Sequence, residues 1–125
     1  MKLTIVNGSP RGRKSNSDKI LEWLLADIKD TPGFSYEKVY VVDIKGRENQ
    51  IEVLKASDSI IVIFPIYTDC MPGIAKEFFE LMESNKEIFV GKPITFIVHS
   101  GFPEAIHSRA IERYNQYFAK LLKMN

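Results

Sequence analysis

The chain has 125 residues, 45% of them hydrophobic, and its 17 Lys and Arg against 16 Asp and Glu give a net charge of +1. This length predicts a single domain, residues 1–125, that buries roughly two-thirds of its unfolded surface, and the small charge argues against nucleic acid as a partner. The lone cysteine, Cys70, excludes an internal disulfide and a four-cysteine iron–sulfur cluster, while the lack of a signal peptide or long apolar stretch predicts a cytoplasmic protein with no membrane partner.

Strand-like and helix-like segments alternate along the chain. Short runs rich in β-branched and aromatic residues predict strands at 3–6, 36–44, 59–64 and 94–98. Apolar residues at helical spacing predict four helices. The first begins at Ser15–Ser17 and ends near residue 28, the second covers 49–55, the third runs from Pro72 to 82, and the last runs from about Ala105 to the C-terminus. The last helix is expected to bury Ile106, Ala110, Ile111, Tyr114, Phe118, Leu121 and Leu122. Four strand–helix units indicate a doubly wound parallel α/β sheet with helices on both faces.

The first loop, which runs from Asn7 to Ser17, is the most informative stretch. Unpaired N–H groups at the start of the following helix and the dipole of that helix together form an anion site. Gly8 is expected to relieve the turn sterically, and Ser15, Asn16 or Ser17 to cap the helix. An ordinary, well-capped turn is the alternative interpretation.

The ligand of this loop is predicted to be a phosphomonoester. The loop is not a Walker A motif, because Arg13 stands where the second glycine is needed, and the dinucleotide pattern Gly-x-Gly-x-x-Gly is absent. Hydroxyls and amides with no metal-binding acid beside them suit a phosphomonoester, and flavin mononucleotide (FMN) is the commonest ligand of that kind in this architecture. The basic run Arg11–Lys14 could be a solvated edge of the loop, but beside a phosphate site Arg11 is its member best placed to add a charge-assisted bond.

Two further loops follow the third and fourth strands, at the sheet edge where such folds bind ligands. In the first of them, Ile66 and Tyr67 offer a surface on which a planar ring can rest, although Tyr67 and Met71 could instead plug the top of the core. In the second, Ser100 and Gly101 suit an electron-rich carbonyl edge, with a helix cap at Ser100 or Glu104 as the alternative. His99 and His107 lack a third metal ligand at a recognisable spacing and are interpreted as structural.

The three loops together resemble the NAD(P)H-dependent FMN reductase family of the flavodoxin-like superfamily. The matching segments are Gly8–Arg11 with Ser15–Ser17, Pro65–Tyr67 with Met71–Gly73 and Lys76, and Ser100–Glu104. The resemblance implies a flavodoxin-like sheet, FMN as cofactor, NAD(P)H as reductant, and usually a homodimer. It assigns the phosphate to Ser9, Arg11, Ser15, Asn16 and Ser17, the lining of the flavin ring to Pro65, Ile66, Tyr67 and Met71, and its pyrimidine edge to Ser100 and Gly101.

Family members continue into a fifth strand and helix, whereas this chain predicts only strand order 2-1-3-4, with the fifth strand missing. The apolar fourth strand, Ile94–Val98, is then an open edge, which predicts a homodimer. The hypothesis is an FMN-binding oxidoreductase that transfers hydride from NAD(P)H to a small acceptor such as a quinone or free flavin, with no side chain as catalytic acid or base. The alternatives are a flavodoxin-type electron carrier without a nicotinamide site, and a non-catalytic truncated remnant that oligomerises.

Overall fold

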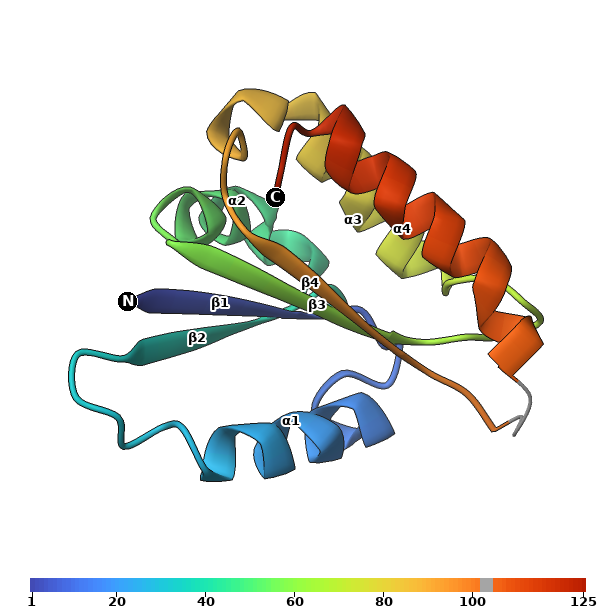
Figure 1. Ribbon diagram of the computed structural model, residues 1–125, viewed down its shortest axis with the longest axis horizontal. Coiled ribbons are helices and arrows are strands. Elements are labelled where there is room, and N and C mark those ends of the chain that lie inside the picture. Colours follow the sequence, from blue (N-terminus) through green and yellow to red (C-terminus); the bar gives the residue numbers. More distant parts are fainter. Residues whose placement is uncertain (102–104) are drawn as a thin grey trace.

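A computed structural model describes residues 1–101 and 105–125. Its strands are β1 (Lys2–Asn7), β2 (Ser35–Tyr40), β3 (Ser59–Pro65) and β4 (Ile94–His99), and its helices are α1 (Asn16–Ala26), α2 (Arg47–Lys55), α3 (Gly73–Ser84) and α4 (Arg109–Leu121). Within the described residues the strands form one parallel sheet in the order β2-β1-β3-β4 (Figure 1). The predicted fold class and strand order are therefore confirmed.

The sheet separates two apolar clusters. On one face α1 packs Leu21 and Leu25 against Leu3 and Ile5 of β1, and on the other face α2, α3 and α4 build the larger cluster (Figure 1). Alternate residues of β1 pack into the two clusters, because successive side chains of a strand point to opposite faces of the sheet. In the larger cluster, Phe79 of α3 stacks on Phe118 of α4 with ring centroids 4.5 Å apart.

Two predicted boundaries and two further predictions for the last helix need correction. β2 ends at Tyr40 and not at 44, because the Asp43 amide turns back to donate to the Tyr40 carbonyl at 3.0 Å. The last helix begins as a 3₁₀ turn, Ala105–Ser108, before α4 proper. Ile106 is 66% exposed and Ala110 is exposed as well, so neither belongs to the buried face. Ser108 holds the N-cap position of α4, and not Ser100; the alternative cap, Glu104, lies outside the described residues.

β4 is an edge strand whose apolar side chains are only partly covered. Ile94, Phe96 and Val98 border a groove of about 380 Å³ between β4 and α4, which Asn115 of α4 also lines. The Asn115 side chain is 5% exposed, and its Oδ1 is the buried side-chain oxygen or nitrogen that lacks a hydrogen-bond partner among the described residues.

Membrane-spanning helices and clusters of metal ligands are both absent from the described residues. No helix in this part of the chain is long and apolar enough to cross a membrane. Nor do the described His, Cys, Asp and Glu side chains gather into a group that could hold a metal ion.

Candidate functional site

A cavity of about 510 Å³ opens at the carboxyl ends of β1, β3 and β4. The parallel strands bring three loops to this edge, as the sequence predicts. The cavity is lined by Ser9, Arg11, Asn16, Pro65, Ile66, Tyr67, Thr68, His99, Ser100 and Gly101. Eight of these are predicted site residues; Thr68 and His99 are additions. The remaining predicted residues, Ser15, Ser17 and Met71, lie outside the lining.

The first loop leaves β1 in close contact with β3. The Gly8 amide donates to the Ile63 carbonyl at 2.7 Å, and a Cβ at position 8 would lie 3.0 Å from the Phe64 Cβ. Gly8 is therefore required by this close packing, and the expectation that it relieves the turn is replaced. A positive φ occurs instead at Gly12, +52°, where a Cβ would also meet Val42.

Ser15 is the N-cap of α1. Its Oγ accepts the Asp18 amide at 3.1 Å and donates to the Gly12 carbonyl at 2.6 Å. The amides of Asn16 and Ser17 follow in the first turn, where a helix offers its own N–H groups no internal acceptor. Since Asn16 lines the cavity, the positive end of the α1 dipole faces it.

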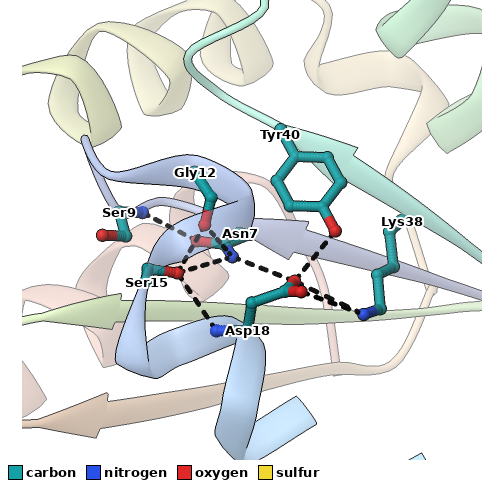
Figure 2. Close-up of polar contacts among 7 residues, drawn as sticks. All are labelled: Asn7, Ser9, Gly12, Ser15, Asp18, Lys38 and Tyr40. Atoms are coloured by element: carbon teal, nitrogen blue, oxygen red, sulfur yellow. Dashed lines mark hydrogen bonds and ion pairs between the residues drawn. The ribbon is translucent and has the colours of Figure 1, made fainter. Parts of the chain in front are cut away.

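Behind the loop lies a buried polar network (Figure 2). The Asn7 Nδ2 donates to the Gly12 carbonyl at 3.4 Å, to the Ser15 Oγ at 3.2 Å and to the Asp18 Oδ1 at 3.4 Å. The Asn7 Oδ1 accepts the Ser9 amide at 3.0 Å. A single amide side chain thus ties together both ends of the loop and the first turn of α1.

The carboxylate of Asp18 connects this network to β2. It accepts the Tyr40 hydroxyl at 2.8 Å and pairs with the Lys38 Nζ at 3.3 Å. Burial, and next the hydrogen bond to Asp18, raise the pKa of Tyr40 to about 12, so the phenol remains a donor at neutral pH. The sequence interpretation gave none of these three residues a role. The available signal was an acidic residue three positions after the cap, on the buried side of a helix.

The basic run of the first loop divides into two parts. Arg11 lines the cavity, and its amide donates to the Ser9 Oγ at 3.3 Å. Arg13 instead makes a bidentate pair with Asp43, at 2.9 and 3.3 Å, and stacks over the Tyr40 ring at 4.1 Å. The hydrogen bond from Arg13 lowers the pKa of the Asp43 carboxyl. The cation available to a ligand from this pair of arginines is therefore Arg11.

The second loop presents an apolar and aromatic surface. Ile66 is buried and its amide donates to the His99 carbonyl at 2.8 Å, whereas Tyr67 is 49% exposed. Tyr67 and Cys70 exchange backbone hydrogen bonds of 2.8 and 3.1 Å around Thr68 and Asp69, whose φ angles are 49° and 62°. These two positive φ angles are those of a type I′ turn, with Thr68 and Asp69 at its centre. Met71 is buried in the larger apolar cluster and is not part of the cavity wall, which agrees with the alternative that it plugs the core.

The third loop is joined to the first by a histidine. His99, the last residue of β4, forms a 2.7 Å hydrogen bond through its Nε2 with the Ser17 Oγ. Burial lowers the pKa of His99, so its imidazole is neutral at pH 7. The hydroxyl of Ser17 is thereby directed to His99, while the imidazole forms part of the cavity wall. The interpretation of His99 as purely structural missed this position.

The cavity therefore has two chemically different ends. Near Ser9, Arg11 and Asn16 it offers helix amides, side-chain donors and one cation, which suit an anion. Near Pro65, Ile66 and Tyr67 it offers flat apolar surface, which suits a planar ring. Its volume falls within the range of small-molecule sites, roughly 300–1,000 Å³. The donor set thus fits a ligand that carries a phosphate at one end and a ring at the other.

Comparison with known proteins gives three findings. A family model described as NADPH-dependent FMN reductase matches residues 1–124. No curated protein sequence matches significantly. Solved structures that resemble the chain include the apo form of NADH:FMN oxidoreductase EMOB, with a TM-score of 0.81 and 20% identity over 97% of this chain and 68% of that one.

Two more solved structures span most of the chain. One is an NADPH-quinone reductase from P. pentosaceus, with a TM-score of 0.73 and 20% identity over 99% of this chain and 80% of that one. The other is an FMN-dependent NADH-azoreductase from Bacillus anthracis in complex with FMN, with a TM-score of 0.72 and 14% identity over 99% of this chain and 83% of that one. At these identities the likeness establishes a shared fold.

Proposed function

The chain belongs to the NADPH-dependent FMN reductase family, and we propose that it is an FMN-dependent oxidoreductase that takes hydride from NAD(P)H and reduces a small acceptor such as a quinone or a free flavin. The observation that carries this proposal is one cavity with an anion-binding end at the first turn of α1 and a flat apolar end at Pro65–Tyr67. Three fold neighbours are described as an NADH:FMN oxidoreductase, an NADPH-quinone reductase and an FMN-dependent NADH-azoreductase, which supports the proposal.

The residues divide between the two ends of the ligand. Ser9, Arg11 and Asn16, with the first-turn amides of α1, hold the phosphate. Ser15 and Ser17 shape that end, Ser15 through the helix cap and Ser17 through His99. The ring rests on Pro65, Ile66 and Tyr67, with Met71 beneath them in the core, and its pyrimidine edge faces Ser100 and Gly101.

Bound FMN supplies the hydride chemistry, so the protein's own task is binding, orientation and exclusion of water. Within the described lining, His99 is the group that titrates closest to neutral pH, and burial keeps it uncharged. No side chain is therefore assigned as catalytic acid or base. The proposal predicts that FMN, with its terminal dianion, binds in preference to FAD, because the polar end of the cavity suits a phosphomonoester.

The absorbance spectrum of the freshly purified protein, with and without added FMN, is the first experiment. We expect a protein-bound flavin spectrum that NADH or NADPH bleaches rapidly under anaerobic conditions in a stopped-flow instrument. Tyr67→Ala should weaken FMN binding, and Tyr117→Ala, which alters a 64% exposed tyrosine on α4, is the matched control. Flavin that binds but is not bleached indicates an electron carrier, and failure to bind FMN refutes the proposal.

We further propose that the protein forms a two-fold homodimer in which β4 pairs with the same strand of a second copy. Among the described residues no strand pairs with the outer edge of β4, where only the Ile94 amide is bonded, to the Asn125 carbonyl at 2.9 Å. The half-covered side chains of Ile94, Phe96 and Val98 and the buried Asn115 Oδ1, which lacks a partner within this part of the chain, also support the proposal. Sedimentation at micromolar concentration should show a dimer, and Thr95→Lys, a charge on this edge, should shift it toward monomer. A wild-type monomer whose β4 amides exchange freely would refute this mode of assembly.

A further inference from the structure

We propose that Asp18 is a positioning residue for the phosphate end of the cavity, and that it acts through the side chain of Asn7 without touching the ligand. The inference rests on the proposed function, because the ligand whose affinity it controls is FMN. It adds a second layer of residues, on α1 and β2, that determines how well the cavity distinguishes a phosphorylated flavin from an unphosphorylated one.

Asp18 is buried yet contributes nothing to the cavity wall. Its side chain faces the Asn7 amide, the Tyr40 hydroxyl and the Lys38 ammonium group (Figure 2), and Asp18 is absent from the lining residues. Burying a carboxylate is costly unless it is paired and hydrogen-bonded. Here all three partners are donors, so the charge is held in a fixed position behind the loop.

The position of this charge determines which way the Asn7 amide faces. An ionised carboxylate only accepts hydrogen bonds, so the Asn7 NH₂ group must face Asp18, and it then also faces the Gly12 carbonyl. The Asn7 carbonyl oxygen is left to accept the Ser9 amide at 3.0 Å. The reverse orientation would place a carbonyl against a carboxylate and an NH₂ group against an N–H. Asp18 thus selects a single arrangement of the loop.

The fixed amide holds the loop segment that lines the cavity. Asn7 contacts Ser9 at the start of this segment and Gly12 at its end, with Arg11 between them. Ser9 in turn accepts the Arg11 amide. Release of the Asn7 amide therefore loosens Ser9 and Arg11 together, and these are two of the groups assigned to the phosphate. The ring end, at Pro65–Tyr67, belongs to a different loop and should be spared.

Lys38 and Tyr40 complete the arrangement from β2. The Lys38 Nζ, 3.3 Å from the Asp18 Oδ1, offsets the carboxylate charge, which would otherwise repel a phosphate dianion across the loop. Tyr40 holds the same Oδ1 with the shortest of the three hydrogen bonds, 2.8 Å. Tyr40→Phe removes that bond alone and leaves the charges in place, so it separates the positioning effect from the electrostatic one.

The test compares dissociation constants for FMN and riboflavin, measured by quenching of flavin fluorescence. Asp18→Asn should raise the Kd for FMN about tenfold, because it replaces the carboxylate that accepts all three donors. Tyr40→Phe should raise it about threefold, because it removes only one of the three hydrogen bonds to that carboxylate. The Kd for riboflavin should change less than twofold in both. The matched controls are Asp27→Asn, at the exposed far end of α1, and Tyr36→Phe, a partly exposed tyrosine on β2; neither should alter either constant.

Amide hydrogen exchange at Ser9 gives a second readout that does not need a ligand. Exchange should accelerate in Asp18→Asn, and should be unchanged in Asp27→Asn. An equal loss of FMN and riboflavin affinity, or no loss of either, overturns the inference, and Tyr40→Phe decides the matter if Asp18→Asn does not fold. A wild-type protein that binds neither flavin refutes the proposed function itself, whereas wild-type FMN binding that Asp18→Asn leaves intact refutes only the inference.

Discussion

Two buried asparagines, one at the cavity end of β1 and one beside the edge strand β4, differ in how completely their side chains are hydrogen-bonded. Asn7, at the end of the central strand β1, is fully buried, and its amide oxygen and nitrogen both have partners. Asn115, on α4 beside the edge strand β4, is nearly as buried, but its Oδ1 has no partner among the described residues. A satisfied buried amide fixes one geometry, whereas an unsatisfied one marks a surface to which a contact can still be added. The ligand end is therefore pre-organised, and the β4–α4 side is not.

The largest difference in stability should appear when each of the two asparagines is replaced by leucine. Asn7→Leu leaves the Ser9 amide, the Gly12 carbonyl and the Asp18 carboxylate without this partner, so the free energy of unfolding should fall by about 3 kcal/mol. Asn115→Leu removes an oxygen that has no partner in the described part of the chain, and should change the free energy of unfolding by less than about 1 kcal/mol. Urea denaturation of the two variants measures both values, and similar losses would remove the basis for contrasting the two regions.

The second comparison is between Gly8, which is closely packed against β3, and Gly73, which has open space around it. Gly8→Ala places a methyl group 3.0 Å from the Phe64 Cβ and 3.2 Å from the Ala75 Cβ, so it should cost about 2 kcal/mol of stability. Gly73→Ala, at the first position of α3, meets no atom within 4 Å and should be neutral or slightly stabilising. Thermal unfolding of both variants is sufficient, and a neutral Gly8→Ala would show that the loop is less tightly packed on β3.

The third comparison sets the cap of α1 against that of α4. Ser15→Ala removes a side chain that caps the helix and contacts both Gly12 and Asn7, and should cost about 1 kcal/mol or slightly more. Ser108 holds the same position in α4, but its Oγ donates to the exposed Glu112 carboxylate at 3.1 Å and does not cap the helix, so Ser108→Ala should cost less than about 0.5 kcal/mol. Equal costs, again from urea denaturation, would indicate that the hydrogen bonds of the Ser15 side chain contribute no measurable stability.

The smallest effect is a dependence on pH through His99, which joins β4 to α1. Burial lowers the pKa of His99 in the folded protein, so the unfolded chain binds more protons once the pH falls toward the ordinary histidine value of about 6.5. Stability present above that pH is therefore lost as the pH falls below it. His99→Gln should lose less stability than the wild type between pH 7.5 and 5.5. A variant with the wild-type pH profile would assign the effect to other groups.

The sequence was sufficient to predict which loops form the cavity. It did not predict the polar network of Asn7, Asp18 and Tyr40, because that network depends on the register between strands. A parallel sheet brings the segments after β1, β3 and β4 to one edge wherever the exact pairing lies, so Ser9, Tyr67 and Gly101 could be assigned to a common site. The polar network needs more, since Tyr40 reaches Asp18 because it pairs with Asn7 across β1 and β2. Local sequence does not encode this pairing.

The predicted and observed positions of His99 and Met71 also differ because of tertiary contacts. His99 lies in the cavity wall because β4 pairs with β3 in a register that places it opposite Pro65. Met71 belongs to an informative loop motif, yet its side chain turns inward to the apolar cluster. The direction in which a loop side chain points depends on tertiary contacts that no spacing pattern records.

The central claim is that the first turn of α1 and the Ser9–Arg11 segment bind the phosphate of FMN while Tyr67 supports the ring. Titration of the wild type, Asn16→Ala and Tyr67→Ala with FMN and with riboflavin tests it most directly. We expect Asn16→Ala to weaken FMN binding severalfold more than riboflavin binding, and Tyr67→Ala to weaken both by a similar factor. If Asn16→Ala lowers both affinities by one common factor, the first loop is not a phosphate site and the account is wrong.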